Sequence, residues 1–124
     1  MQKVYVAHAK AMDYRSLLYE PIRRSGMTDR YDFVFPHESS DGVFSSKEFF
    51  RDLCDILVVE ASVPAPGWGI EMGWADAYGV PIVALCRTDA KLSSSVAAMS
   101  RQVVRYSTPE EMIGGLEAAL RSVQ

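Results

Sequence analysis

The sequence has no run of Lys or Arg, no Cys-X-X-Cys pair and no apolar stretch long enough to cross a bilayer. The first absence, with a formal net charge of -3, argues against a nucleic-acid polymer as partner, because affinity for polyphosphates comes largely from clustered basic side chains. The second argues against a zinc site. Met1 to Lys3 lead directly into a strand-like run without the apolar segment of a signal peptide, which predicts a cytoplasmic protein without a membrane partner.

The chain has 124 residues, of which 48% are hydrophobic and 23% charged. This length and composition suit one globular domain over residues 1–124 that buries its own core. Cys54 and Cys86 each lie inside an apolar run, so we expect two buried, reduced thiols.

Short apolar runs alternate five times with helical patterns. Continuous apolarity is typical of strands that are covered on both faces. We expect strands at residues 4–7, 32–35, 56–59, 81–86 and 103–106. The alternation predicts an α/β fold, a flavodoxin/Rossmann-like three-layer sandwich with a five-stranded parallel sheet in the order 2-1-3-4-5.

Capping residues mark the starts of several helices. Asp13 is expected to cap a helix that Pro21 bends and Gly26 ends, and Ser45 with Glu48 has the spacing of a capping box. Residues 93–95 are all serine and can cap a short helix through residue 99. Thr108 and Pro109, followed by two glutamates, predict the start of the last helix. Residues 37–43 are polar and are expected to form a loop.

In a parallel sheet of this order, ligands bind beyond the carboxyl ends of the strands, at the switch point beside strands one and three. That edge is expected to collect Tyr5, His8, residues 60–67 and Glu71. Gly67, Trp68 and Gly69 are expected to form a tight turn, where the backbone can approach a ligand and the following helix presents free N–H groups to an anion.

Glu71 has two interpretations. Placed in the first turn of the helix after Gly69, its carboxylate could simply interact with the helix dipole. The residues after it are apolar, and a carboxylate held beside aromatic rings can act as a nucleophile toward a sugar carbon. Tyr5 is similarly ambiguous, since its ring can pack in the core while its hydroxyl orients a nearby acid.

The remaining candidates each have a plain structural reading. Neither His8 nor His37 has a second ligand-type residue at metal spacing. Both fit loop histidines better than catalytic ones, although His8 lies at the predicted ligand edge. Trp68 and Trp74 are more typical of a core or an interface than of a ligand-stacking surface.

The central stretch resembles one enzyme family. Residues 55–64 read DILVVEASVP and residues 67–81 read GWGIEMGWADAYGVP. This run, with its Gly-X-Gly-X-Glu core and later Ala-X-X-X-Gly-X-Pro turn, resembles the signature of nucleoside 2-deoxyribosyltransferases and the related 2-deoxynucleoside 5-phosphate N-hydrolases. Weaker agreement extends to Tyr5 and to residues 93–99.

The resemblance implies a Rossmann-like enzyme, usually a homodimer or larger, that cleaves the bond between a sugar C1 and a nucleobase. It implies that Glu71 is the nucleophile, that Tyr5 positions it, and that no metal or organic cofactor takes part. Ser94 or Ser95 falls where a neighbouring subunit contributes a polar contact, so the site would be shared across a homodimer.

The predicted substrate-binding residues, from the expected ligand edge and from the resemblance together, are His8, Lys47, Ala65, Gly67, Trp68, Gly69, Ser94 and Ser95. Two of these differ from the family pattern: Ala65 stands where relatives place Ser or Asp, and Lys47 stands where they place an aspartate. The expected partner is a small nucleoside or nucleotide. A non-catalytic nucleotide-binding module on the same fold is the alternative, and a flavodoxin-like flavin carrier fits less well, since the loop after the first strand lacks a hydroxyl-rich phosphate cradle.

Overall fold

The structure is a computed structural model that describes residues 1–38 and 46–124. Its five strands form one sheet in the order β2-β1-β3-β4-β5, and all neighbouring strands run parallel, which confirms the predicted topology. The strands are β1 (Lys3–Ala7), β2 (Asp32–Val34), β3 (Ile56–Glu60), β4 (Ile82–Arg87) and β5 (Gln102–Tyr106).

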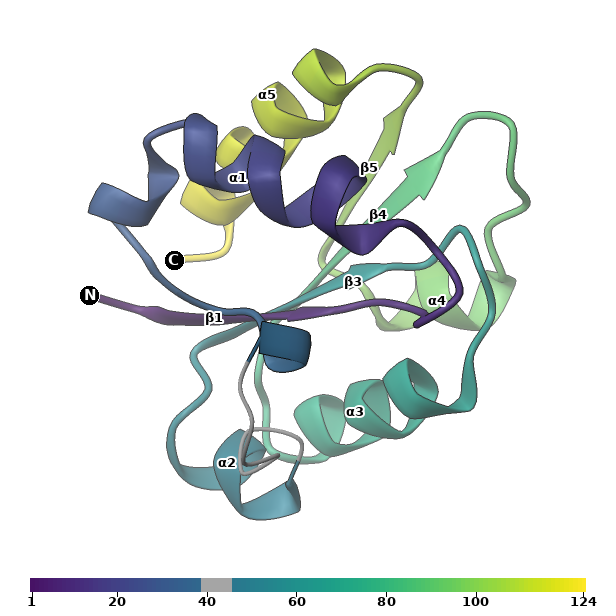
Figure 1. The fold of residues 1–124 in the computed structure, drawn as a ribbon. Helices are drawn as coiled ribbons and strands as arrows, with labels where there is room; N and C mark the ends of the chain where they lie inside the picture. Colours follow the sequence, from purple (N-terminus) through teal and green to yellow (C-terminus); the bar gives the residue numbers. More distant parts are fainter. Residues whose placement is uncertain (39–45) are drawn as a thin grey trace.

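Helices cover both faces of this sheet. Figure 1 shows α1 and α5 over one face, with α2, α3 and α4 over the other. The helices are α1 (Glu20–Arg24), α2 (Lys47–Asp52), α3 (Pro66–Ala77), α4 (Ser94–Met99) and α5 (Pro109–Ser122), and three short turns are η1 (Arg15–Tyr19), η2 (Met27–Asp29) and η3 (Pro36–Glu38). Among the described residues, no helix has the length and apolarity that crossing a membrane requires.

Side-chain alternation in β1 divides the core into two layers. Val4 and Val6 pack with α5, whereas Tyr5 and Ala7 pack with α2 and α3. All four side chains are almost fully buried, as expected for a central strand. Tyr5 therefore faces the helix that carries Glu71.

The first helical region differs from the single bent helix that the sequence predicted. It starts as a π-helical turn, η1, and only then becomes α1. The N–H of Glu20 bonds to the carbonyl of Arg15, five residues back. Pro21 explains the change, because its ring excludes the carbonyl four residues earlier and it has no N–H to offer. Gly26 has φ 83° and ends the region as predicted.

The start of α2 lies one residue later than predicted. Ser46 is the N-cap, and its side chain accepts a hydrogen bond of 3.2 Å from the N–H of Phe49. Ser45, the predicted cap, lies outside the described residues, as do residues 39–43 of the predicted loop. Residues 37 and 38 of that loop belong to the 3-10 turn η3 rather than to irregular loop.

The prediction that Gly67 to Gly69 form a turn before the helix was wrong. α3 begins at Pro66, where a residue without an N–H costs nothing, so both glycines lie in its first turn. Neither glycine has a positive φ. Glu71 consequently lies in the second turn, and the prediction that placed it in the first turn was also wrong.

The last two helices and the cysteines follow the predictions more closely. Thr108 and Glu111 form the complete capping box of α5, and Ser93 is the N-cap residue of α4, although its side chain makes no capping hydrogen bond. Both cysteines are free and buried, as expected. Burial raises the pKa of the Cys54 thiol to about 12, so that thiol is a poor nucleophile.

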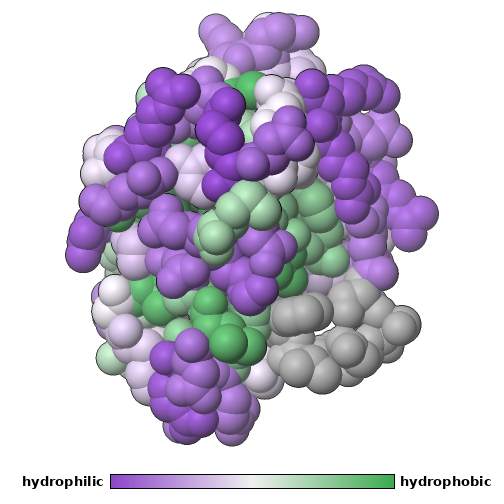
Figure 2. Space-filling model, turned by 90° about the vertical axis from the view of Figure 1, so that its left-hand side faces the viewer, coloured by the Kyte–Doolittle hydropathy of each residue, from purple (hydrophilic) through white to green (hydrophobic). Residues whose placement is uncertain are grey.

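The end of the molecule at which β1 starts faces the viewer in Figure 2. Hydrophilic residues cover most of that surface, and the apolar atoms visible on it lie in separate small patches. The groups that could carry chemistry gather at the other end of the strands.

Two adjacent glycines of α5 provide a matched test of the packing. A Cβ added at Gly115 would lie 2.4 Å from Cγ1 of Val104, whereas one added at Gly114 would meet nothing within 4 Å. We expect Gly115→Ala to lower the free energy of unfolding by about 1–3 kcal/mol through overpacking. Gly114→Ala should raise it by up to about 1 kcal/mol through helix propensity. Urea unfolding of both variants measures the difference, and equal effects would contradict this packing.

Candidate functional site

A cavity of about 380 Å³ lies at the carboxyl ends of β1, β2 and β3, at the predicted switch point. The end of β1 and the residues after it form one part of its wall, η3 forms a second, and the start of α3 forms a third. The lining residues are Tyr5, Ala7, His8, Lys10, Pro36, His37, Ala65, Pro66, Gly67, Trp68 and Glu71.

The acid in this cavity is bound directly by a tyrosine. The hydroxyl of Tyr5 donates to Oε2 of Glu71 over 2.5 Å. Both side chains are buried, with exposed fractions of 1% for Tyr5 and 9% for Glu71. The Tyr5 ring lies against Phe49 and Phe50, with ring centroids 5.7 and 5.1 Å away. The aromatic packing therefore fixes the hydroxyl that orients the carboxylate.

The position of Glu71 argues against the interpretation that its carboxylate only interacts with the helix dipole. Its side chain lies on the buried side of α3 with Trp68, Met72 and Ala75, and it is beyond the first turn, where a charge interacts best with the helix dipole. Burying a carboxylate costs free energy unless it is hydrogen-bonded. Glu71 is thus a cavity group held by β1, and not a helix cap.

His8 follows β1 directly and has an exposed fraction of 6%. Nδ1 lies 2.9 Å from the carbonyl oxygen of Ala9, which can only accept, so Nδ1 carries the proton. Nε2 of the neutral ring then accepts from the hydroxyl of Tyr19 over 2.6 Å. Burial lowers the pKa of His8, and burial likewise raises the pKa of Tyr19 well above its usual value, so both groups stay uncharged at neutral pH.

Further rings and a cation extend this wall. The ring of His8 stacks on Tyr14, with centroids 4.5 Å apart, and lies 4.7 Å from the ring of His37. Burial, and then the positive charge of Lys10, lower the pKa of His37. The cavity thus has an acid held from β1 and α3, and imidazole, phenol and ammonium groups at the residues that follow β1 and β2.

Other predicted residues lie outside this cavity. Gly69 lines an adjacent hollow of about 430 Å³ that also includes Ala65 and Trp68. Ser94 lines a shallow hollow beside Pro64 and Lys91. Lys47 is exposed at the start of α2 and Ser95 is exposed in α4, and neither is among the lining residues of these described hollows. A contribution of Ser94 or Ser95 through a neighbouring subunit stays a prediction.

Trp68 is largely buried and lines both hollows, as its place at the start of α3 allows. Its Nε1 donates to the carbonyl oxygen of Val63 over 2.9 Å. Within the described residues, no group of three or more His, Cys, Asp or Glu is placed to hold a metal ion.

The sequence did not predict the cavity positions of Pro36 and His37, or the stacking of Tyr14 on the lining residue His8. Pro36 and His37 come two and three residues after the end of β2, so the rule that ligands bind at carboxyl strand ends could have found them. Tyr14 reaches the site through its stacking on His8, which no local pattern reveals.

Solved structures share this fold. A CMP N-glycosidase from Clostridium botulinum, BcmB, is 19% identical with a TM-score of 0.66, over 94% of this chain and 99% of that one. A conserved protein from Enterococcus faecalis V583 is also 19% identical with a TM-score of 0.69, over 95% and 98% of the chains. A 3-dehydroquinate dehydratase-like protein from Bifidobacterium longum is 10% identical with a TM-score of 0.58, over 100% and 99%.

No protein-family model matches the sequence, and no curated protein matches it either. At these identities the solved structures show the shared fold. The first of them has the α/β fold that the resemblance through residues 55–81 implies.

The two histidines give a direct test of the cavity wall. Because both pKa values are lowered by burial, both rings should titrate below the usual 6.5. Below about pH 6.5 the unfolded chain then binds more protons than the folded protein. The free energy of unfolding should therefore decrease as the pH falls through this range, and the contribution of the two histidines to it should be fully present above about pH 6.5. NMR titration of the two imidazoles, assigned with a His37→Gln variant, measures the midpoints. Midpoints at or above 6.5 would contradict this wall geometry.

Proposed function

We propose that the protein cleaves or transfers at the N-glycosidic bond of a nucleoside or nucleoside 5-monophosphate, with Glu71 as nucleophile. The observation that carries the proposal is the pair of Tyr5 and Glu71 inside a cavity at the switch point. The resemblance through residues 67–81 supports it, as does the shared fold with a CMP N-glycosidase.

The reaction follows from the placement of the acid. A carboxylate oxygen of Glu71 attacks the anomeric carbon while the bond from that carbon to the base nitrogen breaks, through an oxocarbenium-like transition state. The electron pair stays on the base, which takes a proton from solvent. The sugar remains as an ester on Glu71.

Release reverses this geometry. A water molecule or a second base attacks the anomeric carbon, its proton passes to solvent, and the ester oxygen of Glu71 leaves as carboxylate. Two displacements at one carbon retain its configuration. The Tyr5 hydroxyl holds the side chain of Glu71 in place through both steps, because it donates a hydrogen bond to Oε2. The carboxylate loses its negative charge when the ester forms and regains it when the sugar leaves.

The lining residues suggest how the rest of the ligand is bound. The rings of His8 and His37, which line the cavity, offer aromatic surface for a nucleobase, and Tyr14 stacks on His8. Lys10 and the first N–H groups of α3 near Gly67 offer donors for sugar or anionic oxygens. The partner is thus a small molecule, and a homodimer that adds Ser94 or Ser95 of a second copy would complete the cavity.

A second candidate, a non-catalytic nucleotide-binding module, is favoured by Ala65. It is the N-cap of α3 and offers only a methyl group where a polar side chain could contact the ligand. The exposed position of Lys47, away from the cavity, points the same way. Tight nucleotide binding without turnover across a broad substrate panel would decide for this candidate, and rapid turnover of any member would exclude it.

Substitution of the acid and of its partner tests the mechanism. Glu71→Gln should lower base release or exchange by about a thousandfold or more, because it removes the nucleophile while keeping the shape of the side chain. Tyr5→Phe should lower it by about 10- to 100-fold, the scale of a hydrogen bond to a charged group. Product chromatography over nucleosides and their monophosphates, with and without a free acceptor base, measures both effects and separates hydrolysis from transfer.

The matched control is Glu48→Gln, which changes an exposed acid of α2. It should leave turnover within about twofold of the unsubstituted protein. Full activity of Glu71→Gln would exclude Glu71 as the nucleophile.

A further inference from the structure

A second buried acid lies close to the cavity but outside it. Glu60 is the last residue of β3 and has an exposed fraction of 1%. Its Oε1 accepts from the N–H of Ser62 over 2.7 Å, and its Oε2 accepts from the Ser62 hydroxyl over 3.0 Å. The hydroxyl of Tyr106, at the end of β5, donates to the same Oε2. The carboxylate therefore receives three hydrogen bonds from two residues.

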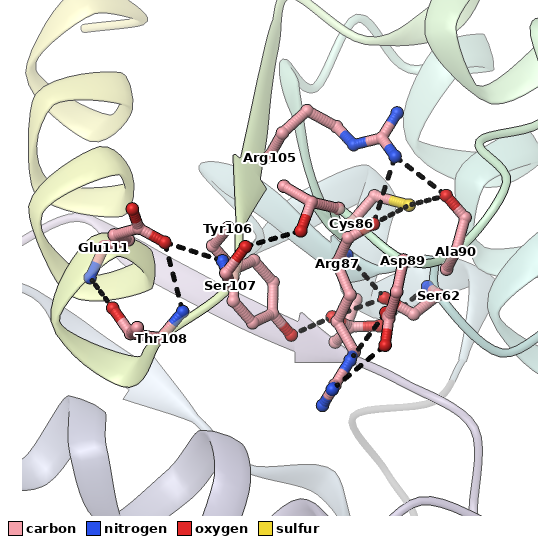
Figure 3. A network of polar contacts seen from close by, with 12 residues as sticks. Ser62, Cys86, Arg87, Asp89, Ala90, Arg105, Tyr106, Ser107, Thr108 and Glu111 are labelled. Atoms are coloured by element: carbon pink, nitrogen blue, oxygen red, sulfur yellow. Dashed lines mark hydrogen bonds and ion pairs between the residues drawn. The ribbon is translucent and has the colours of Figure 1, made fainter.

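This network ties the end of β3 to β4 and β5. The Ser62 hydroxyl oxygen also accepts from the backbone N–H of Arg87, 2.8 Å away, and the N–H of Ala61 donates to the carbonyl of Leu85 over 2.8 Å. Figure 3 shows Ser62 beside Arg87, with Tyr106 reaching toward them from β5. Burial, then the bond to Glu60, raise the pKa of Tyr106 far above neutral pH, so its hydroxyl keeps its proton as a donor.

The residues held by this network lead directly into α3, the helix that carries Glu71. Residues 61–65 connect β3 to α3. Within them, the carbonyl of Val63 accepts from the Trp68 indole, and Ala65 lines the cavity. A shift of this connection would move the start of α3. The cavity wall that Trp68 forms and the backbone that carries Glu71 would move with it.

The polar side chains of Glu60 and Tyr106 favour a role in fixing the backbone of residues 61–65. A buried carboxylate is expensive, and well-packed apolar residues of similar volume usually stabilise a fold as well or better. An apolar side chain at position 60 could fill the space but could not hold both the N–H and the hydroxyl of Ser62. The carboxylate of Glu60 and the hydroxyl of Tyr106 thus fix the conformation of residues 61–65, which an apolar side chain in the same space would not do.

We propose that Glu60 and Tyr106 are positioning residues, which fix the 61–65 connection and through it the place of Glu71 in the cavity. This inference rests on the proposed function for its effect on turnover. A mutation far from the reacting atoms that misplaces a catalytic group by about 1 Å can lower the rate about a hundredfold. Only five residues separate Glu60 from the start of α3, so a displacement at Glu60 can reach the helix that carries Glu71.

The test compares two Tyr→Phe variants that each remove one buried hydroxyl. Tyr106→Phe removes the donor to Glu60. The control is Tyr31→Phe. Tyr31 is 5% exposed, and its hydroxyl accepts a hydrogen bond from the side chain of Gln124. Tyr31 lies just before β2, at the opposite end of the sheet from Tyr106. Both variants keep the ring, so the loss of packing is matched.

Two readouts are measured on each variant. Hydrogen exchange by mass spectrometry follows the backbone of residues 61–69 and needs no substrate. Steady-state kinetics give kcat and KM per folded molecule, with the folded fraction taken from thermal unfolding. A merely structural role would lower the unfolding temperature without changing kcat per folded molecule.

We expect Tyr106→Phe to speed exchange over residues 61–69 about tenfold and to lower kcat about tenfold with KM little changed. Tyr31→Phe should do neither. Glu60→Gln keeps one acceptor oxygen for the Ser62 N–H, so it should have an effect in the same direction and should confirm the result if Tyr106→Phe folds poorly.

Unchanged exchange over residues 61–69 in Tyr106→Phe would overturn the proposal, as would faster exchange with an unchanged kcat. If the unsubstituted protein releases no base from any substrate, the proposed function fails. The exchange comparison then still decides whether the pair holds the connection, and equal exchange in the two Tyr→Phe variants would refute it.

Discussion

The burial of one carboxylate constrains the rest of the site. Glu71 lies on the apolar side of α3, and a buried carboxylate is tolerated only with a hydrogen-bond donor. Tyr5 supplies that donor from the central strand β1, and the aromatic side chains of α2 hold its ring. The strand order places β1 beside β3, and the first two turns of the helix that follows β3 lie near the end of β1. The cavity lies where these constraints meet.

A second tyrosine–glutamate pair repeats this solution at the neighbouring strands. Glu60 and Tyr106 lie at the carboxyl ends of β3 and β5, and together they restrain the connection that leads into α3. The first pair presents an acid to the cavity, whereas the second is closed to it. The shared fold alone does not separate an N-glycosidase from other activities, because proteins with quite different names adopt it. The chemistry of Glu71 and its surroundings therefore carries the proposed function.

The sequence predicted the sheet well because its strands are continuous apolar runs, and capping chemistry at Thr108 is local. It failed where local rules compete. Pro66 starts α3 earlier than Gly67 and Gly69 suggested, which moved Glu71 to the second turn, and Pro21 produced a π-helical turn in place of a bend. The pairing of Glu60 with Tyr106 could not be predicted, because 46 residues separate the partners and only the folded sheet brings them together.

Covalent chemistry at Glu71 is the step on which the proposed function depends most. A 2-fluoro substituent slows both displacements by destabilising their oxocarbenium-like transition states. If the nucleoside also carries a good leaving base, the first displacement stays the faster one and the sugar ester should accumulate. Mass spectrometry of the acid-quenched, digested protein measures it directly. We predict a mass increase of one sugar unit on the peptide that contains Glu71, absent in Glu71→Gln. Base release without any adduct, or an adduct on another residue, would contradict the account.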